Sequence, residues 1–125
     1  MKLLNVFASN VAWGKVTQLR MNPRMAYAIL KYARLVASEY EIVEKSRIAL
    51  IHELTNTKEG ENVSITPGTT VHDDYVKRFS GILDVEAELN PSVLKLDDLL
   101  SAISEDQTNS LSALDIGALE PFFFA

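Results

Sequence analysis

Residues 22–55 decide the fold, and they read NPRMAYAILKYARLVASEYEIVEKSRIALIHELT. Asn22 is a favourable helix N-cap, and Pro23 loses nothing at the first helical position, where its missing N–H has no intrahelical acceptor. Apolar residues then recur every seven positions, at Ile29, Val36, Val43 and Leu50. Because a sustained repeat of this kind makes one apolar face, the stretch predicts a single helix from Pro23 to about Thr55.

The length of this helix has consequences for the whole chain. At 1.5 Å per residue it is roughly 50 Å long, which exceeds the width of a compact domain of 125 residues. We therefore expect part of it to project, to bend or to pack on a second copy. A second apolar row lies one position earlier in each heptad, at Ala28, Leu35, Ile42 and Ala49.

Shorter elements flank the long helix. Residues 56–70 are rich in Asn, Gly and Pro and are predicted to form a loop. Ser112 and Asp115 have the spacing of a capping box and predict the start of a final helix. The predicted shorter helices cover residues 3–19, 71–81, 98–103 and 113–120.

The apolar period changes to two after residue 82. In residues 83–89 apolar side chains alternate with three acids, which is typical of a half-buried strand with an acidic outer face. Residues 90–92 read as a turn, and residues 93–96 as a short return strand. We predict an α+β fold that is mainly helical and forms a single domain over residues 1–125. It has a long central helix, a small antiparallel β-hairpin and short C-terminal helices.

Composition excludes several classes of protein. The chain has no cysteine, which removes disulfides, thiolate metal sites and cysteine nucleophiles. No apolar run approaches the ~20 residues of a membrane span, so we expect no membrane partner and a cytoplasmic location. The net charge of −5 disfavours bulk binding of nucleic acid.

Charge is divided unevenly along the chain. The first acid is Glu39, and six bases precede it. From Ile51 to Ala125 there are fourteen acids and four bases. The basic part could grip a phosphorylated small molecule or a nucleic acid, could complement the acidic part within or between copies, or could be a solvated helix face. The candidate ligand-binding residues are Lys15, Arg20, Arg24, Lys31 and Arg34.

Acids and histidines give weak chemical signals. Asp84, Glu86 and Glu88 project to one side of the predicted strand, where carboxylates can hold Mg²⁺ or Ca²⁺. A flat strand lacks the curved loop of usual Ca²⁺ sites, so we expect no metal and no cofactor. His52 and His72 are the only histidines. Because no nucleophile elbow or phosphate loop accompanies them, we predict no enzymatic activity.

The chain ends in three aromatic residues, Phe122, Phe123 and Phe124. These rings either fold back and close the core or stay exposed and mark an interface. With the row Ile29, Val36, Val43 and Leu50, they form the candidate interface of a homo-oligomer.

The order of these features resembles a family of short phage and prophage proteins of unknown function. The resemblance rests on residues 26–34, on Phe79 leading into residues 83–89, and on residues 111–121. It implies an accessory protein in the cytoplasm of the host cell, with no catalytic residues and with a host or phage protein as partner. We therefore expect a non-enzymatic interaction protein that self-associates. The alternative is an anti-defence or regulatory binder that uses the basic N-terminal part.

Overall fold

The long helix α3 (Pro23–Thr55) is the longest element of the protein. The computed structural model describes residues 1–124. The bounds of α3 are those that the sequence predicts. The Asn22 side chain accepts a hydrogen bond from the Met25 N–H at 2.9 Å, which confirms the predicted N-cap. The helix ends where Asn56 adopts a left-handed conformation with φ 53°, and the Asn56 N–H donates to the His52 carbonyl.

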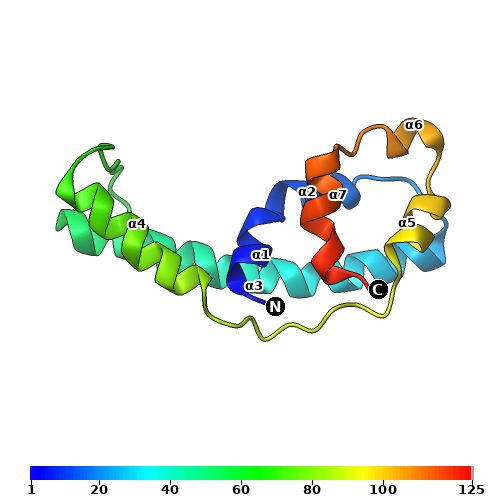
Figure 1. The fold of residues 1–125 in the computed structure, drawn as a ribbon, viewed down its shortest axis with the longest axis horizontal. Helices are drawn as coiled ribbons and strands as arrows, with labels where there is room; N and C mark the ends of the chain where they lie inside the picture. Colours follow the sequence, from blue (N-terminus) through cyan, green and yellow to red (C-terminus); the bar gives the residue numbers. More distant parts are fainter. Residues whose placement is uncertain (125) are drawn as a thin grey trace.

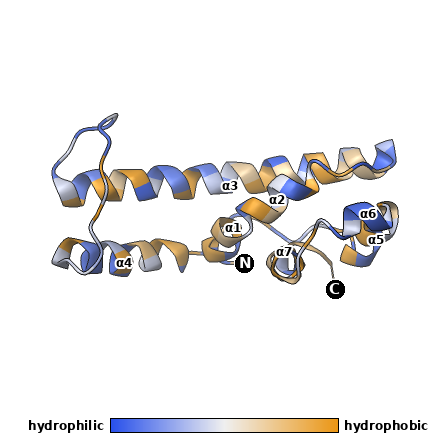
Figure 2. Ribbon diagram, turned by 90° about the horizontal axis from the view of Figure 1, so that it is seen from above, coloured by the Kyte–Doolittle hydropathy of each residue, from blue (hydrophilic) through white to orange (hydrophobic). Residues whose placement is uncertain are grey.

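The other helices form a second layer along α3 (Figures 1 and 2). After the loop, α4 turns back and packs along the C-terminal half of α3, while α1 crosses near its middle. The remaining helices gather beside the N-terminal half of α3. The bounds are α1 (Leu3–Ala8), α2 (Asn10–Val16), α4 (Thr70–Leu83), α5 (Leu96–Ala102), α6 (Glu105–Thr108), α7 (Ala113–Leu119) and the 3-10 turn η1 (Glu120–Phe122).

Two apolar clusters hold the layers together. The larger one lies among α2, α7 and the first half of α3, and it contains Trp13, Leu99 and Phe122. The smaller one joins α1 and α4 to the second half of α3 around Val43 and Phe79. Every residue of the row Ile29, Val36, Val43 and Leu50 is buried, so this face of α3 is the one that the second layer covers.

The predicted β-hairpin is wrong. Leu83 belongs to the last turn of α4, and the part of the chain that the structure describes contains isolated β-bridges but no strand. The segment of residues 85–95, the extended segment, connects α4 to α5 outside any helix, and no β-bridge joins its two halves. Each half pairs with an end of the described chain instead, because those ends lie beside it (Figure 1).

Backbone hydrogen bonds at both ends fix this extended segment. Near α4, the Leu3 N–H donates to the Val85 carbonyl at 2.9 Å, and the Ala87 N–H donates to the Met1 carbonyl at 2.8 Å. Near α5, the Ser92 N–H donates to the Phe122 carbonyl at 2.7 Å, and the Phe124 N–H donates to the Leu94 carbonyl at 2.8 Å. The alternation over residues 83–89 therefore predicts a strand that does not form, since Leu83 is helical and only isolated bridges follow it in the described residues.

Smaller differences concern helix ends. The predicted helix over residues 3–19 is divided into α1 and α2 at the fully buried Ser9, whose hydroxyl donates to the Val6 carbonyl at 3.1 Å. The predicted capping box is confirmed, since Ser112 and Asp115 each accept a hydrogen bond from the other's backbone N–H. None of the helices within residues 1–124 is long and apolar enough to cross a membrane.

Candidate interaction surface

Most of the predicted interface residues are buried in the core of the protein. The α3 row Ile29, Val36, Val43 and Leu50 packs under the second layer. Phe122 and Phe123 are also buried, and only Phe124, which is 60% exposed, reaches the surface. A partner cannot contact the buried side chains without unfolding the domain, so the accessible surface must be sought elsewhere.

The terminal phenylalanines complete an aromatic cluster around Trp13. The Trp13 ring meets Phe122 edge-on with the centroids 5.6 Å apart, and it stacks on Phe123 at 6.0 Å. Tyr32 of α3 approaches both Trp13 and Phe122. These contacts tie the end of the chain to α2 and α3, which gives the aromatic residues a role in the core.

Part of the uneven charge is neutralised within the fold. Lys2 forms an ion pair with Asp84, and the Met1 amino group binds Glu86 at 3.2 Å. The predicted acidic strand face therefore meets the basic start of the chain. This is the complementarity within one copy that the sequence offered as one explanation.

Lys15 belongs to the same system of ion pairs. Its ammonium lies 2.7 Å from the Asp115 carboxylate, which is mostly buried at the start of α7. The Lys15 ammonium and the Ser112 N–H together lower the pKa of Asp115 below its usual value, because both stabilise the ionised carboxylate. Lys15 therefore joins α2 to α7 through this ion pair.

The other four candidate basic residues lie in the loop after α2 and on α3. Arg20 lies in the loop after α2, where its backbone N–H donates to the Gln107 side chain. Arg24, Lys31 and Arg34 are exposed on α3, and no ion pair joins them to any residue that the structure describes. Arg24 and Lys31 lie seven residues apart on one side of the helix, and Arg34, three residues after Lys31, lies next to them.

The second apolar row of α3 is partly uncovered. Leu35 is 53% exposed and Ile42 is 57% exposed. They lie seven residues apart on one side of α3, between Ala28 and Ala49. The sequence shows this row as clearly as the buried one, but it does not show which row the second layer covers.

A groove runs between α3 and the extended segment. It has a volume of about 500 Å³. The Tyr32 hydroxyl donates to the Asn90 carbonyl at 2.7 Å and so joins the two walls. Burial raises the pKa of Tyr32 to about 12, which keeps the phenol neutral. The lining residues are Ala28, Lys31, Tyr32, Leu35 and residues 88–94.

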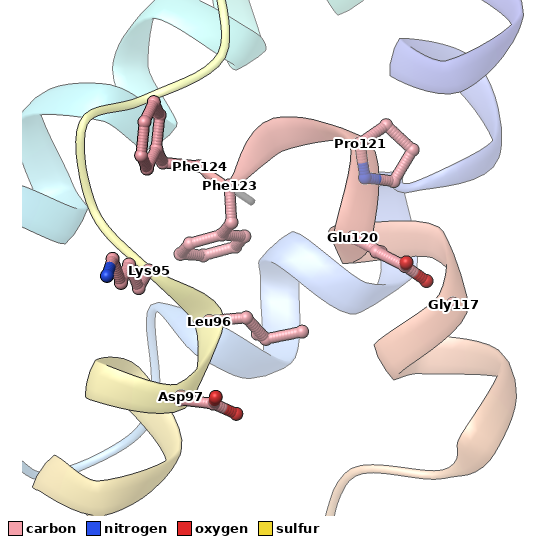
Figure 3. Close-up of a pocket in the computed structure, with 8 residues that line it drawn as sticks. All are labelled: Lys95, Leu96, Asp97, Gly117, Glu120, Pro121, Phe123 and Phe124. Carbon is pink, nitrogen blue, oxygen red and sulfur yellow. The ribbon is translucent and has the colours of Figure 1, made fainter.

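A second depression lies between α5 and α7 (Figure 3) and has a volume of about 540 Å³. The Phe123 ring lies near Leu96 at its inner side, Asp97 belongs to α5, and Glu120 belongs to η1. Lys95 also lines this depression. Two acids and one base line it, and no buried polar group in its lining points to a particular ligand.

The histidines have local contacts. His52 shares a hydrogen bond of 2.7 Å between its Nδ1 and the Thr57 hydroxyl, next to the end of α3. His72 donates its backbone N–H to the Thr69 side chain in the first turn of α4. Both sets of contacts belong to helix ends.

No protein-family model, no curated protein and no solved structure matches this chain.

Proposed function

We propose that this chain is a non-enzymatic interaction protein that associates with a second copy of itself through the uncovered side of α3. The observation that carries the proposal is the exposure of Leu35 and Ile42 on a regular heptad. Helices pair through apolar side chains repeated in this way, and exposed apolar side chains on one side of a helix mark an interaction site when they form a patch.

The setting of this activity belongs to the same proposal. We propose that the chain acts in the cytoplasm of a host cell, as the resemblance to phage and prophage accessory proteins implies. A host or phage protein that presents a matching helix could then replace the second copy. The length of α3 supports this reading, since α3 presents its uncovered side over many turns (Figure 2).

Sedimentation equilibrium over a wide range of concentration tests self-association. The wild-type mass should rise with concentration, whereas Leu35→Lys combined with Ile42→Lys should give the mass of one chain. Leu114→Lys is the matched control, because Leu114 is an 86% exposed leucine on α7. A wild-type mass of one chain at every concentration would refute the proposal.

A second candidate function is binding of a phosphorylated small molecule or a nucleic acid. The exposed bases Arg24, Lys31 and Arg34 favour it, since no ion pair within residues 1–124 engages them. Binding through such side chains would weaken as salt rises. Thermal unfolding with nucleotides, and titration with DNA and RNA at low salt, test this function. No shift in melting temperature and no binding would exclude it.

A further inference from the structure

The groove between α3 and the extended segment has the size and the lining of a small-molecule site. Its volume of about 500 Å³ lies within the roughly 300–1,000 Å³ that such sites occupy. The apolar part of the lining is formed by Ala28, Leu35, Leu89, Pro91, Val93 and Leu94. Val93 is 91% exposed although it is apolar, so a ligand with an apolar body would remove apolar surface from water.

The walls of the groove are formed before any ligand arrives. The hydrogen bond from the Tyr32 hydroxyl to the Asn90 carbonyl holds the extended segment against α3. The Ser92 hydroxyl oxygen accepts a hydrogen bond from the Leu94 N–H at 3.1 Å, which shapes the same segment. A pre-formed site loses less conformational entropy on binding than one that must be assembled.

The charges of the groove restrict the ligand further. Lys31 and Glu88 are its two charged lining residues, and neither forms an ion pair with another residue of the range 1–124. The Lys31 ammonium therefore attracts an anionic group at the edge of an apolar surface. The Glu88 carboxylate repels a second anionic group, so the rest of the ligand should be uncharged.

We propose that this groove binds an amphipathic monoanion, namely an alkyl or aryl carboxylate whose uncharged body lies on the apolar lining and whose carboxylate pairs with Lys31. The site does not depend on self-association, although Leu35 belongs to both surfaces. Lys31 also belongs to the candidate basic set, but here it acts alone and not in a phosphate-binding row.

Isothermal titration of the full chain with decanoate tests the site. Lys31→Met should weaken binding about five-fold, the effect of losing a partly exposed ion pair. Glu88→Gln should strengthen binding, because it removes the repulsive carboxylate. Lys45→Met is the matched control, since Lys45 is an exposed lysine of α3 outside the groove that pairs with Glu41. Its affinity should equal that of the wild type.

Uncharged and cationic probes separate the charge effect from the apolar effect. The expected order of affinity is decanoate, then decan-1-ol, then decylammonium. Val93→Asp should abolish binding, and Val85→Asp, on the same segment but outside the groove, should not. Absence of decanoate binding, equal affinity of the two lysine variants, or tighter binding of decylammonium would overturn the proposal.

Because Leu35 belongs to both surfaces, the titration is made at a concentration at which the mass is that of one chain, and the two proposals then fail separately. A chain that binds decanoate but has the mass of one copy at every concentration retains the ligand site and loses self-association. A chain that assembles without binding decanoate shows the reverse. The gain in affinity expected for Glu88→Gln cannot come from misfolding, so the result remains interpretable if another variant is unstable.

Discussion

Substitution of Phe122 tests how much this residue, near the end of the chain, contributes to the stability of the fold. Its side chain is fully buried and packs against Trp13 and Tyr32, with ring centroids 5.6 Å and 6.5 Å away. Phe122→Ala removes these contacts and leaves a cavity, which costs about 3–5 kcal/mol in well-packed cores. A domain of this size has about 5–15 kcal/mol of stability in total. We therefore expect a folded but much less stable variant.

Urea denaturation followed by Trp13 fluorescence measures this loss directly. At about 3 °C per kcal/mol, the melting temperature should fall by about 10–15 °C. Phe124→Ala is the matched control, because Phe124 is mostly exposed two residues away, and its stability should stay within about 0.5 kcal/mol of the wild type. A loss below about 1 kcal/mol for Phe122→Ala, or equal losses for the two variants, would refute the assignment of Phe122 to the core.

Further predictions concern the helix ends and the partly buried ion pair between Lys15 and Asp115. Asn22→Ala removes the cap of α3 and should lower the free energy of unfolding by about 1 kcal/mol, measured by urea denaturation; an unchanged midpoint would contradict the cap. Asn56→Gly should raise the stability by up to about 1 kcal/mol, because glycine adopts the left-handed conformation at no cost, and thermal unfolding would detect the gain. Asp115 has a lowered pKa in the folded state, so its contribution is present above the unfolded pKa of about 3.9 and is lost as the pH falls through the folded value. Asp115→Asn should therefore flatten the acid limb of a stability curve recorded from pH 7 to pH 2, and an unaltered limb would contradict the pairing with Lys15.

The long helix could be predicted closely because all its signals are local. The Asn22-Pro23 start and the heptad row depend only on neighbours in sequence, and the structure reproduces the bounds Pro23–Thr55. The capping box of Ser112 and Asp115 is local in the same sense. Such features are found in the folded protein because the local preferences agree with the tertiary packing.

The hairpin could not be excluded by the same reasoning. The alternation over residues 83–89 is a local pattern, whereas the pairing partner of an extended segment depends on the tertiary structure. Residues 1–3 and 122–124 supply the partners here, and each comes from a different end of the described chain. The turn-forming residues 90–92 predict a turn, whereas the segment continues past Asn90 and Pro91 toward α5 (Figure 1).

The sequence predicts the candidate interaction surface only in part. The sequence presents two apolar rows on α3, and the choice between them depends on where α1, α2 and α4 pack. The groove joins Lys31 and Leu35 to residues 88–94, which are distant in sequence. Lys15 was a candidate ligand residue because its partner Asp115, in α7, could not be identified from local pattern.

The aromatic cluster also has a consequence for how the chain is made. Trp13 and Phe122 are 109 positions apart, so at about 5–20 residues per second a ribosome exposes the tryptophan roughly 5–20 s before its partner exists. Until α4, α7 and the terminal phenylalanines have been made, part of the buried row of α3 lacks its cover. We therefore expect the nascent chain to reach its folded state only when synthesis is nearly complete.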